Sequence, residues 1–503
     1  MNTLAGHFEF IWSRLLYSIL FLSRRVKMST NETNTLNWDT VFAIPIPYVN
    51  STIISKKSSP QNFDYSSPKK DTIKGDFDNW QIIQGGDGAL IWMTVPVNNV
   101  SGSFDLSNFQ WDQGELIIEV HLEYIPHTDN EMMNDLKVKT KSLDPENPVV
   151  SLKNTIFTKP VKGDAVDNFG AEVVESVISS FLIDWLNENL ADFDHIFTTV
   201  NINKKIDKYA QWAWCKPSYT DYAYCDAPTL DKSILGVLCM TGGRKAGSSQ
   251  IQQIDPYVIP AGDKAGYLVS PLRFLEDLML PTLPFKWENS TTSDYEVVSN
   301  ADTQTGKYQH VLKLKDNTTI KLDETYHDGS SYTPYMTKMS ITNEGNQIIF
   351  NTYTETDVGI GVTAWCQTTH WYTIELGTNK NGQTLKYREL KNAVVEHGTH
   401  ASEGTEILKW MIIVAGVIAT IVLAFVTDGA ALVVGGVIIG CLIGIAAASP
   451  DIIEAVNNDT APNLDLLTLN TTDPIQWSAE DIFKLTSSQL NNALQLGGDP
   501  NFG

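Results

Sequence analysis

DNFGAEVVESVISSFLIDWLNENL, residues 167–190, is the stretch that decides the fold of this chain. Its apolar residues recur at spacings of three and four, which is the period of one helix face. They are Val173, Val174, Val177, Ile178, Phe181, Trp185 and Leu186. Asp167 or Asn168 can cap the start, because a short polar side chain accepts hydrogen bonds from free helix amides. The apolar stripe is wide, so the sequence predicts a long helix that protein or ligand mostly covers.

Alternating strands are predicted on both sides of this helix. In residues 115–124, ELIIEVHLEY, every second side chain is apolar, as expected for a sheet with one wet face. Asp112-Gln113-Gly114 precedes that strand and is predicted as a hairpin turn. Three more hairpins are predicted after residue 305, with turns at Asp316-Asn317, at Glu344-Gly345 and at residues 379–382.

A short second helix is predicted at residues 270–280, SPLRFLEDLML. Ser270 is a good N-cap, Pro271 suits the first turn, and Pro281 should end the helix. A doubly wound parallel sheet would alternate helices and strands more regularly than this chain does. The sequence therefore predicts an α+β protein with long antiparallel strands around one very apolar helix.

Composition narrows the classes of partner. The chain has 503 residues, 59 Asp and Glu against 36 Lys and Arg, and a formal net charge of −23. Such an acid excess argues against nucleic-acid binding, which needs clustered cations, and against electrostatic attraction to anionic lipid. Any contact with lipid would therefore be apolar. The five cysteines show no metal-ligand spacing, and reduced, partly buried thiols are expected, with a disulfide between Cys215 and Cys225 as the alternative.

Two apolar segments, residues 410–427 and 430–448, follow each other near the C-terminus. As helices of roughly 18 and 19 residues, each would span about 27–29 Å, close to the thickness of a bilayer core. Gly436, Gly440 and Gly444 recur every four residues, a spacing that lets two helices approach closely. The sequence predicts an apolar helical hairpin that turns at residues 427–429.

Three environments are open for this hairpin: stable spanning of a membrane, conditional insertion, or packing on the protein's own surface. Two features argue against stable spanning of a membrane. Asp428 carries a charge between the two segments, and Trp410 at their start has no Trp or Tyr counterpart at their other end. The candidate membrane-facing residues are Trp410, Ile413, Val417, Ile421, Phe425, Val434, Ile438 and Leu442.

Residues 1–27 differ from the rest of the chain. Their cations, including Arg24 and Arg25, follow the apolar stretch, whereas a secretory signal places cations before it. We interpret this leader as an upstream extension before a start at Met28, with a peripheral membrane anchor as the alternative.

No arrangement of residues indicates catalysis, a metal or a cofactor, so a non-enzymatic protein is expected. His397 and His400 lack a third ligand at a helpful spacing and are expected in a solvated loop. The Gly-rich segment from Thr241 to Lys245 lacks phosphate-loop spacing and is expected to be a mobile loop. Val177, Phe181 and Trp185 are the candidate lipid-facing residues of the long helix, with ordinary core packing as the alternative.

Several short motifs, spread in order along the chain, resemble the clostridial P-forty-seven and OrfX proteins, which are encoded beside botulinum-type neurotoxin genes. They are Leu36-Asn37-Trp38-Asp39-Thr40-Val41-Phe42-Ala43-Ile44, Phe193-Asp194-His195-Ile196-Phe197-Thr198-Thr199-Val200-Asn201, Ser270-Pro271-Leu272-Arg273-Phe274-Leu275-Glu276, Pro474-Ile475-Gln476-Trp477 and Phe483-Lys484-Leu485-Thr486.

The resemblance implies a tubular lipid-binding (TULIP-like) fold, in which a strongly curved antiparallel sheet wraps a long amphipathic helix. The expected organisation is a leader at 1–27, a TULIP-like domain at 28–406, the apolar hairpin at 407–449, and strands at 450–503 that return to the domain. The implied function is that of a non-enzymatic toxin accessory protein. Its expected partners are a lipid or other apolar ligand, a membrane, or proteins of a toxin complex. A pore-forming toxin component and a scaffold of a toxin complex are the alternatives.

Overall fold

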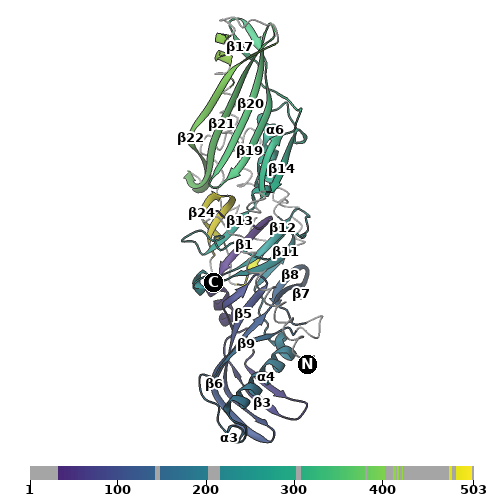
Figure 1. The fold of residues 1–503 in the computed structure, drawn as a ribbon, viewed down its shortest axis with the longest axis vertical. Coiled ribbons are helices and arrows are strands. Elements are labelled where there is room, and N and C mark those ends of the chain that lie inside the picture. Colours follow the sequence, from purple (N-terminus) through teal and green to yellow (C-terminus); the bar gives the residue numbers. More distant parts are fainter. Residues whose placement is uncertain are drawn as a thin grey trace, which may run out of the picture.

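The computed structural model describes residues 32–141, 148–201, 216–301, 308–379, 382–402, 412–414, 416–418, 422, 475–478 and 483–500. The predicted leader at 1–27 and the predicted turn at 427–429 lie outside these residues. The molecule is elongated and mostly sheet (Figure 1). Helix α4 lies toward one end of the long axis, and the hairpin of β17 and β18 lies at the other.

A strongly curled antiparallel sheet forms the α4 end. Its strands are β2 (Asn62–Ser66), β3 (Thr72–Phe77), β4 (Gln81–Asp87), β5 (Leu90–Phe104), β6 (Ser107–Val120) and β9 (Ser151–Ile156). Side chains alternate between buried and more exposed from Leu90 to Asn98 of β5, where Ile91, Met93, Val95 and Val97 are fully buried. This alternation gives the sheet one apolar face, and that face must be covered.

The turn predicted at residues 112–114 is wrong, because β6 runs through it without interruption. Gly114 is needed there for close packing, not for a turn. A Cβ at Gly114 would lie 1.8 Å from the ring of the buried Trp111. A glycine inside a strand often marks such a close approach.

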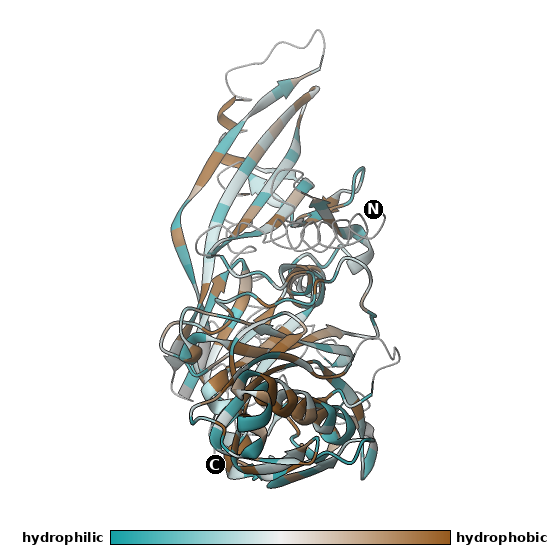
Figure 2. Ribbon diagram, turned by 60° about the horizontal axis from the view of Figure 1, so that its bottom comes forward, coloured by the Kyte–Doolittle hydropathy of each residue, from teal (hydrophilic) through white to brown (hydrophobic). Residues whose placement is uncertain are grey.

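Helix α4 (Ala171–Asn189) lies within the predicted range, and the shorter α3 (Asp164–Phe169) precedes it. Gly170 separates the two helices with a φ of +87°, a conformation that suits glycine. Figure 2 shows α4 in the concave side of the curled sheet, with apolar residues along its inner face.

A second sheet, 13-stranded within the described residues, runs from the middle of the molecule to the β17 end. Its central strands are β11 (Pro217–Cys225), β12 (Ile234–Thr241), β1 (Thr40–Pro45), β13 (Ala265–Val269), β25 (Ala493–Pro500) and β24 (Phe483–Asn491). Its distal strands are β21 (Val362–Asn379), β20 (Gln347–Gly359), β19 (Pro334–Glu344), β15 (Tyr308–Leu314), β14 (Tyr295–Ala301), β16 (Ile320–Lys321) and β22 (Gly382–Ala401). Strands far apart in the sequence, such as β1 and β12, are therefore neighbours.

Smaller elements complete the described fold. A four-stranded sheet contains β7 (Leu122–His127), β8 (Asn130–Val138), β10 (Thr198–Asn201) and β23 (Ile475–Trp477). A two-stranded hairpin consists of β17 (Thr325–His327) and β18 (Ser330–Tyr332). Helix α2 (Ile46–Ser55) follows β1, and short 3-10 turns occur at Leu190–Asp192, Leu230–Lys232 and Thr292–Asp294.

Two of the three hairpins predicted after residue 305 are confirmed. Glu344 pairs with Gln347 between β19 and β20, and Asn379 pairs with Gly382 between β21 and β22. The hairpin predicted at Asp316-Asn317 is wrong, because β15 and β16 each pair with β19 and not with each other. Local alternation predicts strands, but it does not determine which strand is the partner.

The second predicted helix begins where expected, since the Ser270 hydroxyl accepts a hydrogen bond of 3.2 Å from the Arg273 amide. The helical path is α5 (Pro271–Arg273), a π-helical segment (Phe274–Met279), a 3-10 turn (Leu280–Thr282) and α6 (Leu283–Lys286). Pro281 therefore does not end it. Proline is tolerated at the start of a new helical turn, where its missing N–H is not needed.

Candidate functional site

Helix α4 is the first component of the candidate site, because it closes the curled sheet. Its buried residues are Val174, Ile178, Phe181, Leu182, Trp185 and Leu186. They follow the three- and four-residue spacing that places side chains on one helix face. The opposite face carries exposed residues such as Glu172 and Asp184. The helix therefore turns its apolar face toward the sheet and its polar face outward.

Contacts on both sides of α4 reach the two end strands of the curled sheet, β2 and β9. On the β2 side, the Tyr65 hydroxyl donates to Asp184 at 3.3 Å, and the Tyr65 and Phe181 rings lie 5.8 Å apart. On the β9 side, the Ser179 hydroxyl donates to Thr155 Oγ1 at 3.0 Å. The helix thus bridges both edges of the half-barrel.

Aromatic side chains fill the space between α4 and the sheet. The Trp185 ring lies 5.1 Å from Phe77 and 6.2 Å from Phe63, and Phe63 lies 4.7 Å from Phe77. These tilted arrangements are typical of stable aromatic packing. The interior is apolar, and the side chains of the protein itself occupy it.

The structure brings the three candidate lipid-facing residues together on one side of α4. Phe181 and Trp185 are 8% and 5% exposed, and Val177 is half-buried against the same core cluster. All three therefore pack in this core cluster.

Only part of the first apolar segment lies in the described residues. Val414, Ile418 and Val422 are buried against Val358, Val362, Ala364 and Cys366 of β20 and β21. These residues of the segment are four apart, so they form one helix face that packs on the sheet.

Of the candidate membrane-facing residues, Ile413 is exposed and Val417 is half-buried. The others, Trp410, Ile421, Phe425, Val434, Ile438 and Leu442, lie outside the described residues. Among the helices that the structure describes, none is both long enough and apolar enough to cross a membrane.

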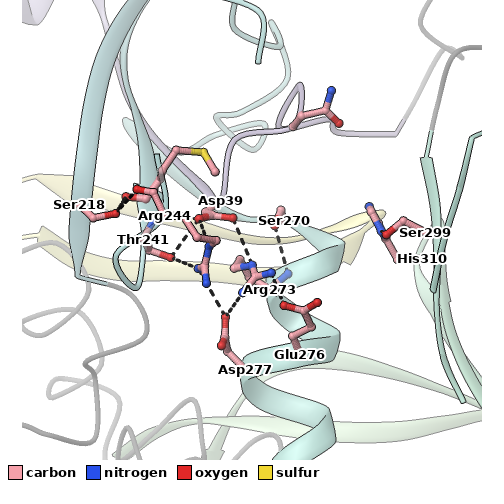
Figure 3. A network of polar contacts seen from close by, with 12 residues as sticks. Asp39, Ser218, Thr241, Arg244, Ser270, Arg273, Glu276, Asp277, Ser299 and His310 are labelled. Atoms are coloured by element: carbon pink, nitrogen blue, oxygen red, sulfur yellow. Dashed lines mark hydrogen bonds and ion pairs between the residues drawn. The ribbon is translucent and has the colours of Figure 1, made fainter. Parts of the chain in front are cut away.

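A polar network joins three segments that are distant in the sequence (Figure 3). The buried Asp39 carboxylate accepts hydrogen bonds from the Thr241 amide at 2.7 Å and from Arg244 Nε at 2.8 Å. It also lies 3.2 Å from Nε of the buried Arg273. Arg273 in turn pairs with Asp277 at 2.9 Å. Buried guanidinium groups need such partners, so the network stabilises this junction.

A cavity of ≈ 370 Å³ adjoins the network, lined by Trp38, Asp39, Arg273 and His310 among others. Ser299 and His310 Nδ1 lie 2.7 Å apart on its far side. Burial, together with the nearby charge of Arg273, lowers the pKa of His310 to about 4. A neutral His310 is therefore expected at pH 7, and the charges of Arg244 and Arg273 are balanced by carboxylates of the network.

Sequence reasoning missed this network, because the segment from Thr241 to Lys245 was expected to be a mobile loop. Arg244 is instead held by Asp39 and lies 3.9 Å from Asp277. The one available signal was that two of the resembling motifs contain Asp39 and Arg273, which are opposite charges.

His397 and His400 do not lie in a solvated loop, so that expectation is also wrong. Both are in strand β22, where His397 pairs with Cys366 in the register with β21. His400 stacks on Trp365 with ring centres 5.9 Å apart. Within the described residues, no group of three or more His, Cys, Asp and Glu side chains is placed to hold a metal ion.

The fold defines a class of elongated, mostly antiparallel β protein whose curled half-barrel is closed by a helix. Residues 35–498 match the model of the OrfX-like family, described as Protein OrfX2/OrfX3/P47. This chain belongs to that family, which confirms the resemblance drawn from the motifs.

Two relatives share the name Protein OrfX3. That of Paraclostridium bifermentans is 43% identical over 490 residues, covering 93% of this chain and 98% of the relative. That of Clostridium botulinum (strain Kyoto / Type A2) is 37% identical over 488 residues, with the same shares covered.

Solved structures of P47 share the fold. P47 from Clostridium botulinum A2 aligns with a TM-score of 0.60 at 19% identity, covering 93% of this chain and 98% of that one. P47 of Clostridium botulinum E1 aligns with a TM-score of 0.62 at 18% identity, covering 94% and 100%. At these identities the likeness concerns the fold alone.

Proposed function

We propose that this protein is a non-enzymatic accessory component of a bacterial toxin system that binds a lipid or other apolar ligand. The ligand lies between α4 and the curled sheet, in a TULIP-like arrangement, and residues 410–448 contribute a membrane contact. The observation that carries the proposal is the position of α4, which bridges β2 and β9 over an apolar interior.

The way in which α4 is attached supports a ligand site beneath it. Side-chain hydrogen bonds at Tyr65, Ser179 and Asn187 join the helix to both sheet edges, and Asn187 accepts from the Val150 amide at 3.1 Å. These are individually weak, about 1 kcal/mol each. Gly170, a flexible residue, lies directly before the helix. A small displacement of α4 would therefore open the interior without unfolding the sheet.

The chemistry of the interior supports an acyl chain as the ligand. Phe63, Phe77, Phe181 and Trp185 present apolar surface toward the helix–sheet interface. Each methylene moved from water into such an environment contributes about 0.8 kcal/mol. The burial of an acyl chain of ordinary length would thus offset the free-energy cost of repacking one or two aromatic rings.

A disulfide that locks α4 tests this proposal. The hydroxyl oxygens of Thr155 and Ser179 are 3.0 Å apart, so cysteines at these two positions would bring their sulfur atoms close together. The reduced double variant should take up a fluorescent fatty acid and carry co-purified lipid in native mass spectrometry. The oxidised variant should take up at least roughly tenfold less, because α4 can no longer move away from β9.

A second disulfide tests whether the effect depends on fixing α4 and not on a disulfide as such. Thr72 and Ser103 also lie 3.0 Å apart, across β3 and β5 of the same sheet, but their bond would leave α4 free. Oxidised Thr72→Cys, Ser103→Cys protein should take up lipid normally. The absence of both co-purified lipid and fatty-acid uptake in the wild type would refute a ligand site under α4.

A further inference from the structure

Exposed apolar side chains gather at the end of the molecule that is opposite to α3. They are Tyr326, Ile360, Ile412 and Ile413, which are 72%, 72%, 56% and 65% exposed. Tyr326 lies on β17, Ile360 lies in the turn between β20 and β21, and the two neighbouring isoleucines are helical. Figure 1 shows β17 and the far ends of β20 and β21 together at this end.

One buried cluster ties these three elements to each other. Val358 and Val362 flank the turn at Ile360, and they pack with Val414 of the helix and with Tyr332 of β18. The Ser402 amide also donates to the Gly361 carbonyl at 2.8 Å. The exposed residues therefore surround a common base, and we call them the apolar tip.

The turn geometry does not account for the side chain at position 360. Gly359 pairs with Val362, and Ile360 and Gly361 both have positive φ, at 51° and 70°. Two-residue turns of this kind favour Asn, Asp or Gly, and a β-branched residue is strained there. Neither burial in the core nor the backbone conformation therefore favours an isoleucine at position 360. Because residues in strained conformations concentrate at functional sites, this side chain is a candidate for a binding role.

The acidic residues near the apolar tip indicate which kind of lipid surface the tip would bind. Asp328 lies two residues from Tyr326 in the sequence, and Asp357 lies three residues from Ile360. Carboxylates there would repel anionic headgroups, whereas isoleucine and tyrosine side chains partition well into a neutral interface. We propose that the apolar tip docks on a zwitterionic lipid bilayer, with Ile360, Ile413 and Tyr326 entering the interface. This inference rests on the membrane contact in the proposed function and assigns it to a surface.

Co-sedimentation with phosphatidylcholine vesicles tests the apolar tip. Wild-type protein should bind, and Ile360→Asn should lower the bound-to-free ratio roughly tenfold, since one large aliphatic side chain no longer leaves water. Adding Ile413→Gln and Tyr326→Ser should abolish sedimentation. Asparagine suits the backbone at position 360, so the melting temperature of Ile360→Asn should equal or exceed that of the wild type.

Leu106 offers a matched control. It is 98% exposed with a φ of +65° in the two-residue turn between β5 and β6, next to Ser107, which bonds Asn168 of α3. Leu106→Asn makes the same chemical change at the opposite end and should leave sedimentation unchanged. Three results would each overturn the proposal. The first is an equal loss of vesicle binding in Leu106→Asn, and the second is normal vesicle binding by Ile360→Asn. The third is a wild-type protein that binds vesicles only when they contain anionic lipid.

The disulfide-locked protein separates this inference from the ligand site. Oxidised Thr155→Cys, Ser179→Cys protein should still sediment with vesicles, because the apolar tip does not involve α4. Loss of sedimentation on oxidation would overturn docking through the apolar tip. If Ile360→Asn sediments with vesicles normally, docking through the apolar tip is refuted. If the same variant also takes up lipid normally, the ligand site under α4 is unaffected.

Discussion

Asp39 and Arg273 meet with 3.2 Å between Oδ1 and Nε, and both side chains are almost fully buried. Asp39 immediately precedes β1, and Arg273 ends α5, so the pair joins the central sheet to the helical path after β13. Removing one member of a buried ion pair leaves the other without full compensation. We therefore expect Asp39→Asn to lower the free energy of unfolding by about 3 kcal/mol, as measured by urea denaturation.

An exposed ion pair provides the control for that change. Asp112 and Lys162 lie 3.1 Å apart with both side chains largely in solvent. Asp112→Asn should cost less than about 1 kcal/mol. Equal effects of the two substitutions would show that the Asp39 network does not stabilise the junction.

Trp185 links α4 to the curled sheet, and Trp185→Ala should lower the free energy of unfolding by about 3–5 kcal/mol. The truncation leaves a void beside Phe63 and Phe77, whose rings it contacts. Val173→Ala on the exposed side of α4 should change stability by no more than about 0.5 kcal/mol. Chemical denaturation of both variants checks this, and a small effect at position 185 would contradict tight packing under the helix.

His195 should make the protein less stable in acid. Burial, and secondarily the charge of Lys56, lowers the pKa of His195 to about 3 in the folded chain. In the unfolded chain the histidine pKa is ~6.5. Between these values the unfolded chain binds a proton that the folded chain does not, so stability is lost as the pH falls below ~6.5, with a slope approaching ~1.4 kcal/mol per pH unit.

A substitution isolates that contribution. His195 Nδ1 lies 2.9 Å from the Ser58 hydroxyl, and His195→Asn retains a polar group near that position. The variant should be less stable at pH 7.5 but should lose less stability between pH 6.5 and 4. Parallel stability curves for wild type and variant would rule out His195 as the source.

Gly266 in β13 is required by close backbone packing. A Cβ there would lie 2.2 Å from the Val258 carbonyl oxygen and 2.7 Å from the Ile259 Cα. Backbone atoms cannot move aside cheaply, so Gly266→Ala should cost about 2 kcal/mol or more, comparable to overpacking of a core. Gly247→Ala, whose Cβ would meet a single side-chain atom at 3.7 Å, should be nearly neutral in thermal unfolding.

Periodicity predicted the elements whose structure depends on near neighbours in the sequence. The spacing of Val174, Ile178 and Trp185 indicated a helix with a covered face, and α4 has that face buried. The turn at Glu344-Gly345 was predictable because the residues of a tight turn determine its own conformation.

Local patterns failed where a distant residue decides the outcome. Gly114 looked like a turn residue, but the ring of Trp111 and the Ile156 carbonyl leave no room for a larger side chain. Arg244 lies in a loop, as its Gly-rich neighbours predict, but its ion pair with Asp39 could not be predicted because the two residues are far apart in the sequence. The face on which Val414 and Ile418 pack is supplied by β20 and β21, well before them in the chain.

The amino-acid sequence by itself therefore determined the antiparallel strands, the apolar helix and membership of the family, because alternation, helical period and short motifs are local properties. Only the tertiary structure decided that α4 bridges β2 and β9, that Asp39 meets Arg273, and that β17 shares one end of the molecule with the turn between β20 and β21. The reason is physical. Strand pairing and ion pairing depend on distances in space between segments, and the one-dimensional pattern of either segment does not contain those distances.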